Sequence, residues 1–219
     1  MLDYGKSCKT SNSFWVIDPV DGTKGFLRGG HYAICLAYVE NNVPVFGILG
    51  CPTIHKGTIL YAMKDKGAYQ MNIQTLEVVK LSCKNFQKNL SECIFTSSFE
   101  KSHSNSEFLH SLMHQVNCST EMLPVDSQVK YAFVANGTAD VYIRYPNKSR
   151  KEKIWDHAAG SLIVRESGGK VTDLSGKELK FITDELDIDK LILCCSNVNI
   201  HSQIISVLQE KINSIKLVD

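Results

Sequence analysis

The strongest constraint on how this chain folds is an apolar segment, residues 14–17, that runs directly into two closely spaced aspartates, Asp18 and Asp21. A short apolar run followed by a turn signal predicts a buried strand. Pro19 has no amide hydrogen for a strand ladder, so we expect the strand to end at Asp18 and the chain to turn over residues 20–23. In such a turn both carboxylates, with a backbone carbonyl between them, can converge on one Mg²⁺ ion, which prefers oxygen ligands.

Gly22 and Thr23 follow the aspartates and are expected to begin a helix. The first amide hydrogens of a helix have no partner within it, and the helix dipole favours negative charge there, so these two residues can hold an anion such as phosphate. Residues 18–23 therefore have the layout of a metal and phosphate site. Because Asp and Gly are also common turn residues, a plain acidic turn is the alternative interpretation of this motif.

The composition limits the classes of protein to consider. The 219 residues suffice for one sizeable domain, and we predict a single domain over residues 1–219. The formal charge of +1 argues against a nucleic-acid partner but allows a local basic pocket for a small anionic ligand. The eight cysteines include no CxxC pair, which favours reduced thiols in the cytoplasm. No apolar run reaches the length of about 20 residues needed to cross a bilayer, so we expect no membrane partner.

The first part of the chain, residues 1–90, has the pattern of an antiparallel sheet. Strands are expected at residues 31–40 and 43–50, joined by a turn at Asn41 and Asn42, and this hairpin continues into strands at residues 57–63 and 68–71.

The pattern changes to alternating strands and helices over residues 91–219, so we predict an α/β fold. Asp126 or Ser127 is expected to N-cap one helix, and Asp156 to begin another. The expected strands are residues 92–96, 140–144 and 191–196, and the expected helices are residues 104–116, 126–136, 157–167 and 200–215.

Two classes of phosphatase share parts of this pattern but fit the sequence poorly. Haloacid-dehalogenase-like phosphatases also have a strand that ends in two aspartates, but there the acids are two residues apart, whereas Asp18 and Asp21 are three apart. Cysteine-dependent phosphatases need an arginine six positions after the cysteine, and the position six residues after Cys51 is Gly57. A covalent cysteine mechanism is therefore not expected.

A second motif, residues 154–160, places Asp156 at a predicted helix start ahead of the small residues Ala158, Ala159 and Gly160. The small residues allow close packing against a sheet, and the carboxylate lies at the positive end of the helix, free to bind a metal. Taken alone, Asp156 is better explained as an N-cap. Considered together with Asp18 and Asp21, it becomes a candidate metal ligand.

Together, residues 15–30 and 153–169 resemble the inositol monophosphatase superfamily of lithium-sensitive, magnesium-dependent phosphatases. Within it, residues 18–29, 125–131 and 139–144 are similar to the 3'(2'),5'-bisphosphate nucleotidase branch. The resemblance implies a layered α/β sandwich of the inositol monophosphatase and fructose-1,6-bisphosphatase type. It also implies hydrolysis of the 3'-phosphate of adenosine 3',5'-bisphosphate, and of 3'-phosphoadenylyl sulfate, in sulfate assimilation.

The resemblance also implies roles for individual residues. A metal-activated water would attack phosphorus in line, without a phosphoenzyme, and Thr23 would orient that water. The amides of Gly22 and Thr23 would hold the scissile phosphate. The implied Mg²⁺ ligands are Asp18, the Val20 carbonyl, Asp21 and Asp156, and the implied nucleotide contacts are His103, Ser104, Ser127, Lys130 and Arg144.

The chain departs from the family at its N-terminus, where we find no counterpart of the helical segment that supplies a glutamate ligand and a water-activating aspartate. We therefore expect an incomplete domain, an uncovered apolar sheet face, and weak Mg²⁺ binding and turnover. Hydrolysis of inositol 1-phosphate or inositol 1,4-bisphosphate, and a pseudophosphatase that binds nucleotide without cleaving it, are the alternatives. The charged run at residues 148–153 is expected to be a solvated loop without a specific role.

Overall fold

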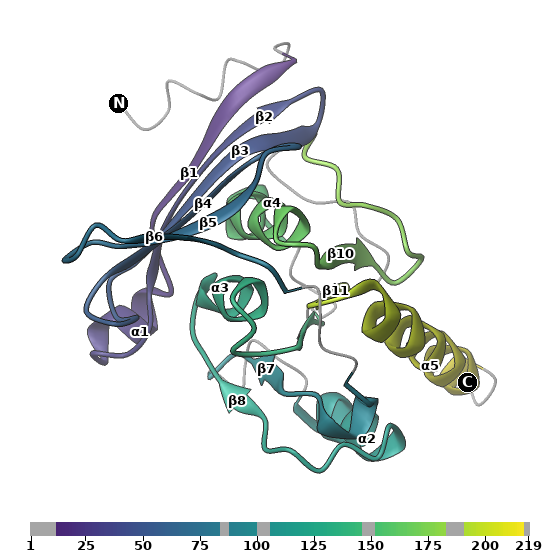
Figure 1. The fold of residues 1–219 in the computed structure, drawn as a ribbon. Helices are drawn as coiled ribbons and strands as arrows, with labels where there is room; N and C mark the ends of the chain where they lie inside the picture. The colour runs from purple at the N-terminus through teal and green to yellow at the C-terminus, as the bar shows by residue number, and fades with distance from the viewer. Residues whose placement is uncertain (1–11, 84–87, 100–105, 146–151, 183–190, 217–219) are drawn as a thin grey trace.

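The computed structural model describes residues 12–83, 88–99, 106–145, 152–182 and 191–216. Within residues 12–83, six antiparallel strands form a meander in which each strand pairs with its neighbours in sequence (Figure 1). Asn41 and Asn42 have φ values of 50° and 66° and form the expected tight turn between β2 and β3. The strands are β1 Ser13–Asp21, β2 Ala33–Glu40, β3 Val43–Cys51, β4 Thr58–Met63, β5 Gly67–Asn72 and β6 Val78–Lys80.

A second sheet follows, and its five strands in the described residues are ordered β10-β11-β9-β7-β8. β7 runs parallel to β8 and β9, whereas β11 runs antiparallel to β9 and β10. The mixture of parallel and antiparallel pairs agrees with the predicted α/β fold. These strands are β7 Phe95–Ser97, β8 Leu123–Pro124, β9 Val141–Arg144, β10 Lys170–Asp173 and β11 Ile192–Cys195.

The helices complete a layered arrangement (Figure 1). One hydrophobic cluster joins the first sheet to α3, α4 and the near face of the second sheet, and another joins the far face to α2 and α5. The order is therefore sheet, helices, sheet, helices, which confirms the predicted layered α/β sandwich. The helices are α1 Thr23–Leu27, α2 Ser106–Gln115, α3 Val129–Ala135, α4 Ala158–Glu166 and α5 Val198–Lys216, with short 3₁₀ turns η2 Leu90–Glu92 and η4 Ile154–Asp156.

The two faces of the first sheet differ in how they are covered. On the inner face, α4 packs so closely on β3 that a Cβ at Gly47 would lie 3.2 Å from the Cα of Ala159. On the outer face, Trp15, Ile17 and Ile34 are 60%, 58% and 45% exposed. Within the described residues, the outer face therefore carries the uncovered apolar surface that the sequence predicted.

The end of β1 differs from the prediction. The strand does not stop before Pro19 but continues to Asp21. Asp18 pairs with Cys35 and Asp21 pairs with Ala33, so three steps along β1 correspond to two along β2. This extra residue is a β-bulge, which interrupts the ladder where proline cannot donate a hydrogen bond.

The start of α3 also differs from the prediction, because neither Asp126 nor Ser127 is its N-cap residue. Gln128 precedes the helix and makes no side-chain cap hydrogen bond. The Ser127 hydroxyl accepts a hydrogen bond from the Val129 amide at 3.2 Å. Asp126 instead forms an ion pair with Arg28, which lies 98 residues earlier in the chain and which local pattern cannot connect to it.

Other boundaries shift by a few residues. Asp156 lies in η4, and His157, not Asp156, directly precedes α4. The strand expected at residues 92–96 begins at Phe95, after η2. The helix expected at residues 104–116 is seen as α2, and its first two expected residues lie outside the described ranges.

Strands β6, β8 and β10 were not expected. No helix in the described residues is long and apolar enough to span a membrane.

Candidate functional site

A cavity of about 570 Å³ is lined by the end of β1, the start of α1, the segment before α3, and η4. It brings together residues that are far apart in the sequence. Ser98, Tyr131, Tyr142 and Trp155 also contribute to its wall. His103 and Ser104 lie outside the described residues. The predicted site residues that line the cavity are Asp18, Val20, Asp21, Gly22, Thr23, Ser127, Lys130, Arg144 and Asp156.

Three carboxylates form the acidic part of this cavity. One oxygen of each of Asp18, Asp21 and Asp156 lies within 4.8 Å of the others. Residues three apart point to opposite faces of a regular strand, so Asp18 and Asp21 could not both face Asp156 if β1 were regular. The bulge between them shifts the register by one residue and places both carboxylates on the same side.

The surroundings of these carboxylates favour a bound cation. The pKa of Asp21 is raised to about 6, because burial and the charges of Asp156 and Asp18 raise it by more than Lys130 and a hydrogen bond from the Gln128 amide lower it. Burial also raises the pKa of Asp18, a hydrogen bond from the Val20 amide lowers it, and Asp156 raises it. Mutually repelling oxygen ligands of this kind fit a hard divalent cation, whose charge removes the repulsion.

The turn that follows β1 depends on a glycine. Gly22 has φ 82° and ψ 44°, in the left-handed region, and a Cβ there would lie 2.8 Å from the Cβ of Ser127. Glycine meets both requirements, the unusual φ and the close approach. The turn leads into α1, in which the Phe26 amide donates to the Gly22 carbonyl at 2.9 Å. Gly22 and Thr23 thus line the same cavity as the acidic group, and their role in holding phosphate stays a prediction.

Lys130 brings a buried positive charge to the same cavity. It is 4% exposed, and its ammonium donates to the Val125 carbonyl at 3.1 Å and to the Ser127 carbonyl at 2.7 Å. Burial lowers the pKa of Lys130 to about 8, although Asp21 opposes this change. A lysine in this setting is suited to bind an anionic ligand, because the ligand adds negative charge that stabilises its protonated form.

Arg144, at the end of β9, is held by a glutamate that the sequence analysis assigned no role. Glu152 is 2% exposed and accepts from Arg144 Nε at 3.0 Å and from His157 Nε2 at 2.9 Å. Its other oxygen, Oε1, lies 3.0 Å from Arg144 Nη2, an ion-pair contact without hydrogen-bond geometry. The Tyr131 hydroxyl bonds His157 Nδ1 at 2.9 Å.

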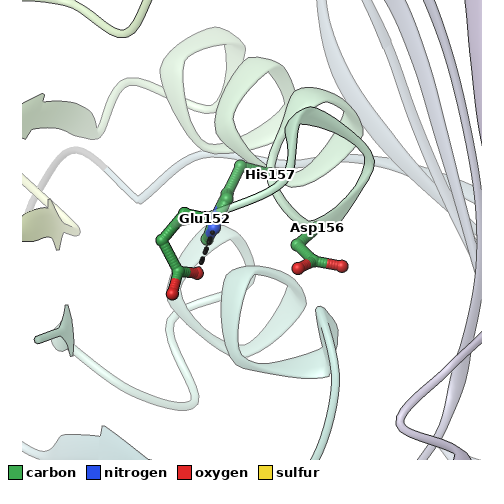
Figure 2. Close-up of side chains that lie close together, drawn as sticks. All are labelled: Glu152, Asp156 and His157. Carbon is green, nitrogen blue, oxygen red and sulfur yellow. Dashed lines mark hydrogen bonds and ion pairs between the residues drawn. The ribbon is translucent and has the colours of Figure 1, made fainter. Parts of the chain in front are cut away.

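Figure 2 shows Glu152 directed at His157, with the Asp156 carboxylate apart from this pair. Burial raises the pKa of Glu152, but hydrogen bonds and charges of His157 and Arg144 outweigh it and lower the pKa to about 2. Glu152 is close enough to Asp156 and His157 for the three to share a metal. The Glu152 carboxylate is already bound to the Arg144 guanidinium. We therefore interpret Glu152 and His157 as a network of ion pairs and hydrogen bonds that orients Arg144.

The expectation of a solvated loop at residues 148–153 is therefore wrong for Glu152. Residues 148–151 lie outside the described ranges, and Lys153 lies over the Trp155 ring, 5.7 Å from its centroid. Composition alone predicts that a single glutamate among basic residues, such as Glu152, is exposed to solvent. Its partners are eight residues before it and five after it, so no helical or strand spacing could have indicated its burial.

Comparison with known proteins identifies the family to which the chain is similar. A family model described as the inositol monophosphatase family matches residues 3–213. The 3'(2'),5'-bisphosphate nucleotidase of Dictyostelium discoideum is 36% identical, over 97% of this chain and 67% of its own length. The enzyme of that name from Schizosaccharomyces pombe is 41% identical, over 76% of this chain and 51% of its own length. This chain therefore spans between half and two thirds of these relatives.

Solved structures show the same fold. CysQ from Bacteroides thetaiotaomicron, a bacterial member of the inositol monophosphatase family, is 25% identical, with a TM-score of 0.71 over 88% of this chain and 73% of that one. The inositol monophosphatase TM1415 of Thermotoga maritima is 27% identical, with a TM-score of 0.71 over 94% of this chain and 72% of that one. On the family match, the relatives and the shared fold, the chain belongs to the inositol monophosphatase family.

Proposed function

We propose that this chain is a magnesium-dependent phosphomonoesterase that removes the 3'-phosphate of adenosine 3',5'-bisphosphate to give AMP, with 3'-phosphoadenylyl sulfate as a second substrate. The observation that carries the proposal is one cavity that combines three convergent carboxylates with the buried cations Lys130 and Arg144. A metal site alone would suit many phosphatases. Lys130, together with Arg144 oriented by Glu152, adds cationic donors that suit a substrate with a second phosphate.

The proposed work of the chain's residues follows from the cavity. Asp18, Asp21 and Asp156, with the Val20 carbonyl, would hold Mg²⁺, which when bound activates water and neutralises the leaving oxygen. Thr23 would orient the water, whose oxygen would bond to phosphorus in line as the bond from phosphorus to the 3'-oxygen breaks, with a net transfer of one proton from the water to the departing 3'-oxygen. The amides of Gly22 and Thr23 hold the phosphate that is transferred.

The other half of the substrate is assigned to the basic part of the cavity. Lys130, Arg144 and Ser127 would bind the nucleotide and its 5'-phosphate, because both cations are donors without acceptor capacity. The names of the curated relatives support a nucleotide substrate. Lithium inhibition, a role in sulfate assimilation and a place in the cytoplasm are parts of the same proposal.

The test is phosphate release from adenosine 3',5'-bisphosphate, inositol 1-phosphate and inositol 1,4-bisphosphate, each assayed with Mg²⁺ and with added lithium. We expect the nucleotide to be preferred and millimolar lithium to inhibit. A preference for either inositol phosphate would replace the proposed substrate. Calorimetry that finds tight nucleotide binding without phosphate release would instead identify a pseudophosphatase.

A further inference from the structure

Gln128 is a buried residue of the cavity wall that the sequence analysis did not single out. It is 2% exposed and lies between Ser127 and α3. Its backbone amide donates to Asp21 Oδ2. Its side chain crosses to η4 and α4, which carry Asp156. It thus contacts both chain segments that supply the carboxylates of the acidic site.

The side-chain amide of Gln128 holds the backbone on both sides of Asp156. Gln128 Nε2 donates to the Trp155 carbonyl at 2.8 Å, one residue before Asp156. Gln128 Oε1 accepts from the Gly160 amide at 3.1 Å, four residues after it. These are one donor contact and one acceptor contact from the same planar group. A glutamate has no donor when ionised and a methionine has neither function, so an amide is needed to make both bonds.

The bond to Gly160 also replaces a missing helix cap. Gly160 is the third residue of α4, and the amide at that position is normally satisfied by the N-cap side chain. His157, which precedes α4, makes no side-chain cap hydrogen bond. Lys153, which precedes η4, makes none either. The short segment that carries Asp156 therefore has no cap of its own, and Gln128 supplies the anchor from another element.

We propose that Gln128 is a positioning residue that fixes the distance between Asp21 and Asp156, and so sets the affinity of the acidic site for a divalent cation. The proposal rests on the metal site of the proposed function. Groups that orient metal ligands typically change affinity about 10–100-fold when they are removed. Gln128 does so through backbone positions, because it holds residues 155 and 160 in place relative to the amide that binds Asp21.

The experiment measures Mn²⁺ binding to the full 219-residue chain by electron paramagnetic resonance, without substrate. Gln128→Met keeps the side-chain volume and removes both side-chain bonds, whereas the backbone bond to Asp21 remains. Gln128→Asn keeps an amide but is too short to reach both partners, and it serves if the methionine variant does not fold. Val134→Ala, a fully buried change on α3 that does not line the cavity, is the control for loss of stability alone.

We expect Mn²⁺ affinity to fall about tenfold or more in both Gln128 variants, while Val134→Ala lowers the melting temperature and leaves the affinity unchanged. Unchanged affinity in folded Gln128 variants would overturn the proposal and leave the proposed function standing. Equal weakening in Val134→Ala would assign the effect to stability and would also overturn it. No Mn²⁺ binding by the unaltered chain would overturn this proposal together with the proposed metal site.

Discussion

At the scale of single residues, Asp21 is held in a charged form that the fold itself disfavours. Its carboxyl ionises near 3.8 when unperturbed and at about 6 in the folded chain. Between these values the folded state keeps a proton that the unfolded state loses, so the stability of the metal-free chain falls as pH rises. Above about pH 6 the loss of stability caused by the charged, buried Asp21 carboxylate is complete, and a bound cation would offset this loss.

Asp21→Asn removes this penalty and one metal ligand. We expect the metal-free variant to be about 1 to 3 kcal/mol more stable than the unaltered chain at pH 7, and this difference to vanish below about pH 4. Urea unfolding of the two metal-free proteins at a series of pH values measures the difference at pH 7 and its disappearance in acid. Phosphate release should be abolished. A variant less stable at pH 7 would contradict our account of the Asp21 pKa, because the change conserves volume and an acceptor for the Gln128 amide.

Glu152 has the opposite dependence on pH. Its pKa is lowered from 4.5 to about 2, so its contribution to stability is complete above about pH 4.5 and is lost as pH falls towards 2. Glu152→Gln leaves Arg144 and His157 without their buried anion, and we expect a loss on the order of 3 kcal/mol at pH 7 that shrinks in acid.

The matched control for Glu152 is Glu178→Gln. Glu178 pairs with Arg165 at 3.3 Å, but its side chain is 69% exposed. A surface ion pair is worth about 0–1 kcal/mol, so this variant should unfold almost as the unaltered chain does. Equal losses of unfolding free energy in the two variants, measured by urea unfolding at pH 7, would show that the buried network around Arg144 stabilises the fold no more than an exposed ion pair does.

At the scale of elements, the turn between β1 and α1 decides how closely the predicted phosphate site approaches α3. Gly22→Ala adds a Cβ that meets Ser127 at 2.8 Å, at a φ of 82°. Gly29→Ala is a matched control, since Gly29 has φ 73° but a Cβ there meets nothing within 4 Å. Each variant has the cost of a left-handed alanine, about 1–2 kcal/mol, and only Gly22→Ala has the steric clash.

We therefore expect both glycine variants to lose stability in thermal unfolding, with the larger loss in Gly22→Ala. Only Gly22→Ala should also lower phosphate release at saturating Mg²⁺, because it moves the residue 22 and 23 amides away from the segment before α3. An equal loss of activity in Gly29→Ala would mean that general loosening of the turn, and not the contact with Ser127, affects the site.

At the scale of the whole molecule, one face of the first sheet is apolar and uncovered in the described residues. Trp15 packs on Tyr38, with ring centroids 4.9 Å apart, and remains 60% exposed, while Ile17 is 58% exposed. Exposed apolar patches of this kind bind hydrophobic probes. Ile17→Thr keeps a β-branched residue in the strand and removes apolar surface.

We expect Ile17→Thr to lower the fluorescence of a bound anilinonaphthalene sulfonate dye and to change stability by about 0.5 kcal/mol or less. Val16→Thr is the control, because Val16 neighbours Ile17 but is 6% exposed and lies in the core. It should destabilise the fold by about 1 kcal/mol or more through a buried hydroxyl. Dye binding unaffected by Ile17→Thr would show that the outer face is not the apolar surface that the dye detects.

The sequence by itself determined the features that local chemistry sets. The hairpin at Asn41 and Asn42 follows from a two-residue turn, and the α/β class follows from the change in periodicity along the chain, whereas the layered sandwich was implied by the family resemblance. Asp18, Asp21 and Gly22 stand within five residues of one another, so their neighbourhood was predictable without knowledge of the fold.

Only the tertiary structure decided which of these segments contact one another. The pairing of β1 with β2 fixes the bulge that turns Asp18 and Asp21 to one side, which the proline alone did not reveal. Glu152 is buried because Arg144 and His157 converge on it, and Gln128 spans from Asp21 to the turn of Asp156. These contacts depend on which elements pack together, and a buried polar group is specified by partners from several elements, so no local periodicity in the sequence encodes it.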